Sequence, residues 1–328
     1  MQKTWRANLF FVVLLVVLAI YSLGVGGADI GFGDILRLFS SENSIDEAKK
    51  TILLQIRLPR LIMALLIGML LASSGVVVQS VFLNPLADPY IIGIAASATF
   101  GAVIAYFLKL PDIYYGVFAF FVASVLSLVI FSLYKRGKNI ATLLIIGIAF
   151  SSFLGAFTSF ATYLIGEDSF RIVAWMMGFL SGATWEKVAI LAFPVVLTSI
   201  YFYLKRHELN LLLSGDEEAK TLGVNVEKSK KSLLIIASLA TAFSVAFTGM
   251  IGFVGLIIPH TLRLILRTSS NVILIPNSLI VGALFLLFCD NLSKSILSPI
   301  EIPIGVVTAF FGAPFFLFLA MKQGRGNV

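Results

Sequence analysis

Few residues in this chain are of a type and spacing that could do chemistry. Its two histidines, His207 and His260, and its one cysteine, Cys289, form no set with the spacing of zinc or haem ligands. The segment 215–221 is one residue short of a phosphate-binding loop and lacks the second glycine of that motif. Its three consecutive carboxylates would also repel phosphate. We therefore expect no catalytic residue, no metal site and no cofactor bound by this chain.

The composition is that of a membrane protein. Hydrophobic residues make up 59% of the chain and charged residues 12%, whereas soluble domains carry about 25% charged residues. The longest polar interruptions, 29–60 and 205–231, are too short to form a separate soluble domain. The net charge of +7 comes from cations that border apolar stretches, which indicates membrane topology and not nucleic-acid binding. We expect one transmembrane domain over residues 1–328.

Stretches of about 20 apolar residues are long enough to cross a hydrocarbon core of about 30 Å. They predict an all-α, polytopic protein with about ten transmembrane helices, the eighth short and bent: 8–27, 58–81, 90–108, 113–134, 139–165, 187–204, 232–250, 254–267, 272–291 and 303–321. An even number places both termini on one side, and the basic cluster 135–138 favours the cytoplasmic side. Residues 1–28 also fit a cleaved secretory signal, but their apolar run is longer than usual, so we expect a retained helix.

The fifth span carries small residues at every fourth position and no charged side chain between 139 and 165. One interpretation is helix packing, because small residues let backbones approach closely. The other is that the stripe and two nearby threonines line a wide path for a bulky solute: Gly147, Ser151, Gly155, Thr158, Ser159 and Thr162. An ion-coupled carrier usually has an ionisable residue near the membrane centre, and an enzyme needs a nucleophile, a carboxylate pair or a metal cluster. An ion-coupled carrier and an enzyme are therefore both less favoured.

The polar segment 205–231 contains more apolar residues than a solvated connector needs. Gly215 and Gly223 divide it into two short helical pieces. A simple connector is the alternative to a docking element for a soluble partner. The apolar residues that would serve docking are Leu209, Leu212, Leu213, Ala219 and Leu222.

Several blocks in order resemble the FecCD-type permeases of bacterial ABC importers, which carry cobalamin, haem and ferric siderophores. These blocks are RLPR at 57–60, NPLADP at 84–89, WMMG at 175–178, LNLLLSGDEEAKTLGV at 209–224, TGMIGFVGLIIPHTLRLIL at 248–266 and EIPIGVVTAFFGAPFFLFL at 301–319. The resemblance implies a homodimer or close heterodimer of ten-helix subunits, two ATP-binding subunits that hold ATP and Mg²⁺, and an extracytoplasmic solute-binding protein. It implies a multi-pass protein of a bacterial or archaeal cell membrane with both termini in the cytoplasm.

The resemblance also implies roles for single residues. Segment 209–224 would be the coupling helices that contact the ATPase, and the fifth span would line the path. The cytoplasmic gate would comprise Asn84, Leu86, Ala141 and Thr142. The residues that would bind carboxylates of the binding protein are Arg57, Arg60 and Lys294. Lys294 stands where the family commonly has arginine. Arg60 would alternatively support the start of the helix.

Two arginines on a proline-stiffened turn at the outer face favour this docking role over simple snorkelling of long side chains. From the usual cargo of the family we expect a ferric siderophore, with haem, cobalamin or an oxyanion as alternatives. An ion-coupled secondary transporter is a more distant alternative.

Overall fold

The computed structural model describes residues 2–38, 46–111, 113–133 and 140–324. Helices lie at all ten predicted spans in this part of the chain: α1 (Gln2–Gly24), α4 (Leu58–Phe82), α5 (Ile94–Phe107), α6 (Ile113–Leu133), α7 (Ile140–Ile165), α9 (Trp185–Leu204), α12 (Val226–Thr248), α13 (Val254–Leu266), α14 (Asn271–Ser295) and α15 (Ile304–Gly324). The all-α prediction is confirmed. The basic cluster 135–138 lies outside the described residues.

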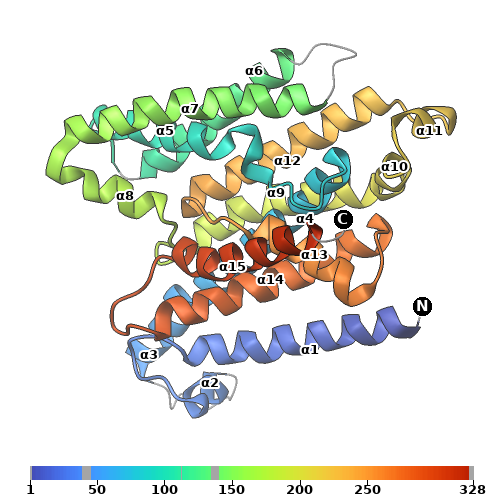
Figure 1. Ribbon diagram of the computed structural model, residues 1–328. Helices are drawn as coiled ribbons and strands as arrows, with labels where there is room; N and C mark the ends of the chain where they lie inside the picture. Colours follow the sequence, from blue (N-terminus) through green and yellow to red (C-terminus); the bar gives the residue numbers. More distant parts are fainter. Residues whose placement is uncertain (1, 39–45, 112, 134–139, 325–328) are drawn as a thin grey trace.

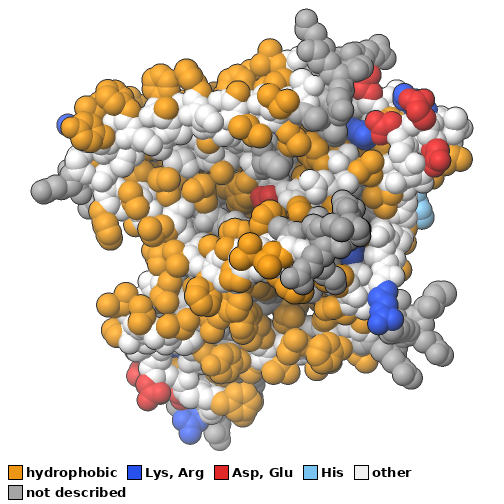
Figure 2. All heavy atoms as spheres, viewed as in Figure 1, with side chains coloured by type: hydrophobic (Ala, Val, Ile, Leu, Met, Phe, Trp, Pro, Cys, Tyr) orange, Lys and Arg blue, Asp and Glu red, His pale blue; other side chains and the backbone are white. Residues whose placement is uncertain are grey.

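Seven of the described helices are long and apolar enough to cross a membrane. Helices α5 and α13, and the apolar stretch Ile304–Leu319 of α15, are shorter. The short eighth span predicted at 254–267 is thus confirmed. In the space-filling view, apolar side chains cover most of the visible body of the bundle, and charged ones gather mainly toward its two ends (Figure 2). This distribution fits a bundle whose sides face lipid.

Eight shorter helical segments connect the long helices in the described residues: α2 (Phe32–Leu38), α3 (Glu47–Thr51), η1 (Ile52–Arg57), η2 (Pro89–Ile92), η3 (Gly166–Ser169), α8 (Phe170–Met176), α10 (Arg206–Leu212) and α11 (Asp216–Thr221). In Figure 1 the long helices run roughly across the view. The N-terminus, α10 and α11 lie on the right, and α2 and α3 lie on the left. We call these the α10 end and the α2 end of the bundle.

Helix α4 forms the centre of the bundle, whereas α7 lies at its edge. In the most apolar stretch of the helical run Glu47–Phe82, 78% of the residues are buried, against 22% in Thr142–Ile165. Two glycines allow α4 and α14 to touch, because a Cβ atom on Gly68 would lie 2.3 Å from the carbonyl oxygen of Gly282. Ala64, Gly68 and Ala72 form a stripe of small residues at every fourth position of α4, and this stripe is therefore used for close packing.

The predicted turn at Leu58-Pro59 is wrong, because the chain is helical without a break from Glu47 to Phe82. The π-helical segment η1 precedes the proline, and the N–H of Leu58 bonds to the carbonyl of Leu53, five residues back. Pro59 lacks an N–H, so it fits where the helical ladder is already shifted. Arg57 and Arg60 consequently sit on a helix and not on a stiffened turn.

Candidate functional site

The segment predicted to couple the chain to a partner forms two short helices at the α10 end. Gly215 lies between α10 and α11 with φ of 105°, and Gly223 follows α11 with φ of 86°. Both are positive φ values that side chains other than glycine rarely adopt. The two glycines therefore allow the sharp turns that let α10 and α11 fold back at the end of α9.

The apolar residues of this segment divide into an inward and an outward group. Leu209, Leu212 and Ala219 are fully buried and pack against the core of this chain. Leu213 is half-buried, whereas Leu222 is 61% exposed. Packing within the chain thus explains most of the apolar residues that sequence reasoning assigned to docking. Leu222 remains the large apolar side chain of this group that is available to a partner.

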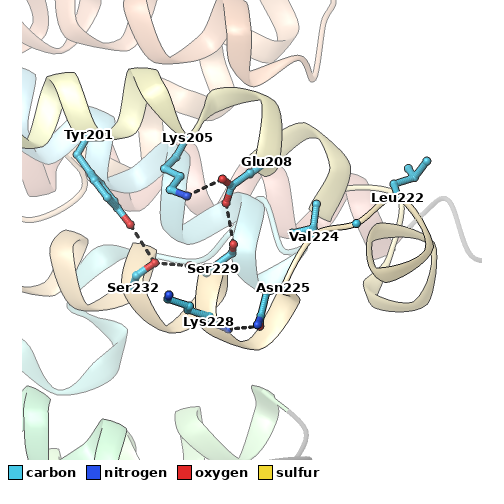
Figure 3. A pocket seen from close by; sticks show the side chains of 10 residues that line it. Tyr201, Lys205, Glu208, Leu222, Val224, Asn225, Lys228, Ser229 and Ser232 are labelled. Carbon is cyan, nitrogen blue, oxygen red and sulfur yellow. Dashed lines mark hydrogen bonds and ion pairs between the residues drawn. The ribbon is translucent and has the colours of Figure 1, made fainter.

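A cavity of about 440 Å³ lies beside Leu222, between the end of α9, α10 and the start of α12 (Figure 3). Figure 3 shows polar side chains along one side and Leu222 directed outward at its edge. Ten residues line the cavity: Tyr201, Lys205, Glu208, Leu222, Gly223, Val224, Asn225, Lys228, Ser229 and Ser232. The arrangement gives the α10 end a hollow next to an exposed apolar side chain.

The carboxylate of Glu208 holds the wall of this cavity together. Its Oε1 is 2.5 Å from Lys205 Nζ, and its Oε2 accepts a hydrogen bond of 2.7 Å from Ser229 Oγ. Partial burial raises the pKa of Glu208, but the bonds from Lys205 and Ser229 lower it more, so the net pKa lies below its ordinary value. The wall therefore joins α10 to α12 through a group that stays ionised at neutral pH.

The predicted gate residues after α4 lie in a tight turn. Leu83 ends α4 in the left-handed conformation, and the N–H of Asn84 bonds to the carbonyl of Gln79. Asn84 Oδ1 accepts the N–H of Leu86 at 2.9 Å, so this side chain shapes its own turn. Asn84 is exposed and Leu86 half-buried.

The other part of the predicted gate begins α7. Thr142 is half-buried, and the side chain of Ala141 lies outside the described part of the structure. No hydrogen bond described for this chain joins Thr142 to Asn84 or Leu86. The structure thus places the two parts of the predicted gate on separate elements.

The predicted path residues on α7 do not share one environment. Gly147 is buried, and Ser151 donates a hydrogen bond to its carbonyl. Gly93 lies close to both, because a Cβ atom added to Gly93 would be 3.1 Å from Ser151 Oγ. Gly147 and Ser151 pack against the start of α5, as the packing interpretation predicts. A Cβ atom on Gly155 would have no neighbour within 4 Å.

The remaining stripe residues lie further along α7. Thr158 is buried, Ser159 is exposed, and Thr162 donates to the carbonyl of Thr158 at 2.7 Å. The side chains that α7 presents outward are mainly large and apolar: Ile145, Ile148, Phe153, Phe157, Phe160, Tyr163 and Leu164. Only part of the small-residue stripe is therefore open to a solute.

The three cations predicted to dock a binding protein are buried at the α2 end. Arg57 donates hydrogen bonds of 2.6 Å to the carbonyls of Leu23 and Ala28. These bonds fasten the start of α4 to the end of α1, and they give this cation acceptors inside the chain.

Arg60 and Lys294 share the carboxylate of Asp290. Asp290 is fully buried, and its Oδ1 and Oδ2 lie 2.9 Å from Arg60 and 3.0 Å from Lys294. Arg60 also pairs with Glu301 at 2.7 Å, and Lys294 donates to Ser22 Oγ. Docking by the three cations stays a prediction, and a partner's carboxylate would meet groups that already have acceptors.

Sequence reasoning missed a polar network between α10, α14 and α4. Asn210 contacts Ser270 and Asn271 at the start of α14, and Asn271 contacts Ser80 on α4. The signal available was the presence of amide side chains beside apolar spans, which a membrane interior tolerates only with partners. Asn210 lies between leucines in the sequence, so the apolar pattern drew attention away from its amide side chain.

Comparison with known proteins shows that permease proteins of two transport systems are similar to this chain over nearly its whole length. The chain is 36% identical over 322 residues to the hemin transport system permease protein HmuU of Yersinia pestis, covering 96% of this chain and 95% of that protein. It is 36% identical over 325 residues to the molybdate import system permease protein MolB of Haemophilus influenzae, covering 96% and 95%.

A solved structure has the same fold over nearly the whole chain. It is described as a metal-chelate type ABC transporter in an inward-facing conformation, and the TM-score is 0.86 at 34% identity, over 97% of this chain and 99% of the other. Residues 14–322 match the FecCD transport family. The chain therefore belongs to the FecCD transport family.

Proposed function

We propose that this chain is the permease subunit of an ATP-driven importer and that it has no ATPase site of its own. The observation that carries the proposal is the α10–α11 segment, which projects at one end of an apolar bundle and exposes Leu222 beside a cavity. A soluble ATPase can bind such an element in a groove of its own surface. The relatives are named as permease proteins of transport systems, which agrees with this division of labour.

The proposed assembly contains a second permease subunit, two ATP-binding subunits and a binding protein. The α10 end faces the cytoplasm, and the α2 end receives the binding protein near Arg57, Arg60 and Lys294. The carboxylate of Glu301 is 34% exposed and is the accessible part of this cluster. ATP and Mg²⁺ belong to the ATP-binding subunits. In this assembly the exposed apolar face of α7 would meet a second copy of the chain and the path between the copies.

The proposed substrate is a metal chelate, with a ferric siderophore as first candidate. The match over 97% of the chain to a metal-chelate type transporter supports this class. Haem is the second candidate, because α7 presents Phe153 and Phe157, whose ring centroids are 4.9 Å apart, on its exposed face. Aromatic rings of this kind pack well against a flat macrocycle. The 36% identity to a hemin permease agrees with it.

The substrate proposal is tested by uptake into liposomes that contain the permease with its ATPase. Radioactive ferric siderophore, haem, cobalamin and molybdate are supplied outside, together with the binding protein, and ATP is enclosed inside. ATP-dependent uptake of the siderophore or haem alone is the expected result. Uptake of molybdate without uptake of any chelate would contradict the metal-chelate proposal.

A further inference from the structure

Helix α14 receives its N-terminal cap from α10 and not from its own preceding residue. Ser270 makes no side-chain hydrogen bond to an N–H of the helix. Instead, Asn210 Oδ1 accepts the N–H of Asn271 at 2.6 Å, and Asn210 Nδ2 donates to Ser270 Oγ at 3.1 Å. The first N–H groups of a helix need an acceptor, and asparagine is among the best caps. The position of α10 therefore fixes the start of α14.

Asn271 passes this contact on to α4. Its side chain is fully buried, and its amide lies 2.9 Å from Ser80 Oγ, which is also buried. Ser80 Oγ also lies 2.8 Å from the carbonyl of Val76. One hydroxyl proton cannot serve two acceptors. The Ser80 hydroxyl therefore donates either to the Val76 carbonyl within α4 or to Asn271 Oδ1 on α14, and the second arrangement joins the two helices.

The α4 side of this contact leads directly to the turn that contains Asn84. Ser80 is three residues before Leu83, which ends the helix. Its neighbour Gln79 accepts the N–H of Asn84 through its backbone carbonyl. The side chain of Gln79 donates to the carbonyls of Gly255 and Leu256 and accepts a bond from Arg263.

Gln79 and Ser80 form a layer at the end of α4, and this layer is consequently hydrogen-bonded on three sides, to α13, to α14 and to the turn. A network of buried hydrogen bonds keeps one geometry, because each unpaired group would lack water as a substitute. A shift of α14 at this level therefore has to move the layer as a unit or break a bond.

We propose that Asn210, Asn271 and Ser80 are positioning residues that link the coupling helix α10 to the turn 83–88. When a partner moves α10, the Asn210 cap moves the start of α14, and the Asn271–Ser80 contact carries that shift to the last turn of α4. This inference rests on the proposed function, because it assigns the route by which ATP hydrolysis acts on the gate. It predicts that the link affects the yield of transport per ATP more than the rate of hydrolysis.

The test uses the full permease with its ATPase and binding protein in liposomes, and it measures substrate uptake and ATP hydrolysis in the same preparation. Asn210→Ala and Ser80→Ala should each lower the uptake per ATP at least about fivefold, the low end for coupling between two sites. The double variant should be no worse than the single ones, because both break the same link. Asn210→Asp should keep a near-normal ratio, since a carboxylate still accepts the Asn271 N–H and suits a helix N-terminus.

Two buried residues on the same helices serve as matched controls. Ser73 of α4 bonds only to carbonyls of its own helix, and Asn277 of α14 donates to the carbonyl of Ile273. Ser73→Ala and Asn277→Ala should keep the wild-type ratio. If Asn210→Ala does not fold, the Ser80→Ala and Ser73→Ala pair still decides.

The proposal is overturned if Ser80→Ala lowers the ratio no more than Ser73→Ala, or if the losses in the double variant multiply. Failure of the proposed function would look different. In that case the wild-type protein itself would show no ATP-dependent uptake, whatever the variants do.

Discussion

Arg60 and Asp290 are 230 positions apart in the chain and form a buried ion pair with 2.9 Å between guanidinium and carboxylate. Lys294 approaches the second oxygen of the same carboxylate at 3.0 Å. One buried carboxylate thus holds two cations, one from α4 and one from α14. The pair joins the two central helices at the α2 end, while the Asn271–Ser80 contact joins them at the α10 end.

Removal of this carboxylate should destabilise the fold strongly. Asp290→Asn leaves Arg60 and Lys294 buried without their shared counter-ion, a situation that typically costs about 3–5 kcal/mol. Thermal unfolding in detergent should show a much lower midpoint for this variant. Glu47→Gln is the control, because Glu47 is 85% exposed and its 3.6 Å pair with Lys50 should contribute less than about 1 kcal/mol. Equal midpoints for the two variants would show that the buried pair is not important for stability.

Docking of the binding protein is best tested at Glu301. Arg57→Glu would place a carboxylate against the carbonyls of Leu23 and Ala28, so it would disturb folding as well as docking. Glu301→Gln instead removes the negative charge that pairs with Arg60 at the accessible side of the cluster. We expect the affinity for the binding protein to rise by a factor of about two to five, as for one exposed ion pair.

The measurement is binding-protein affinity across a salt series, with Glu186→Gln as control. Glu186 is an exposed carboxylate at the start of α9, at the same end of the bundle. The control should leave affinity unchanged. If Glu301→Gln also leaves it unchanged at every salt concentration, the three cations have only the structural contacts described above.

Leu222 should be the main apolar contact to the ATPase. Leu222→Asp removes an exposed anchor and should cost about 2 kcal/mol of association, close to a thirtyfold rise in Kd. Lys220→Ala, about half a helical turn before Leu222 and paired with Glu217, should have a much smaller effect. Copurification and titration of the ATPase measure both. Normal binding by Leu222→Asp would show that the segment is a connector.

Gly155 and Gly68 are both small residues of membrane helices, but the structure predicts opposite results for them. Gly68→Ala places a methyl group 2.3 Å from a carbonyl oxygen of α14 and should destabilise by about 1–3 kcal/mol. Gly155→Leu meets open space and should fold normally, while its bulk reduces substrate uptake if α7 lines the path. Unfolding midpoints and uptake of folded protein separate the two effects. Normal uptake by Gly155→Leu would remove this part of α7 from the path.

The sequence predicted the helices well because a membrane requires long apolar spans, and each of the ten spans contains a helix. It could not separate burial within the chain from burial against a partner. Leu212 and Leu222 have the same side chain and lie in one segment, yet one packs inward and the other is exposed. The same limit applies to Arg60, whose carboxylate partner Asp290 lies on a distant helix. Contacts between distant helices depend on how the helices pack, and the spacing of apolar residues along the sequence does not show this.

This chain should move a substrate only with energy from a separate ATPase. The most direct measurement is uptake of the chelate by liposomes that contain the permease alone, the permease with active ATPase, or the permease with an ATPase whose catalytic carboxylate is replaced. We expect uptake against a gradient only in the second preparation, with ATP hydrolysis only where the active ATPase is present. Energised uptake, or ATP hydrolysis, by the permease alone would contradict it.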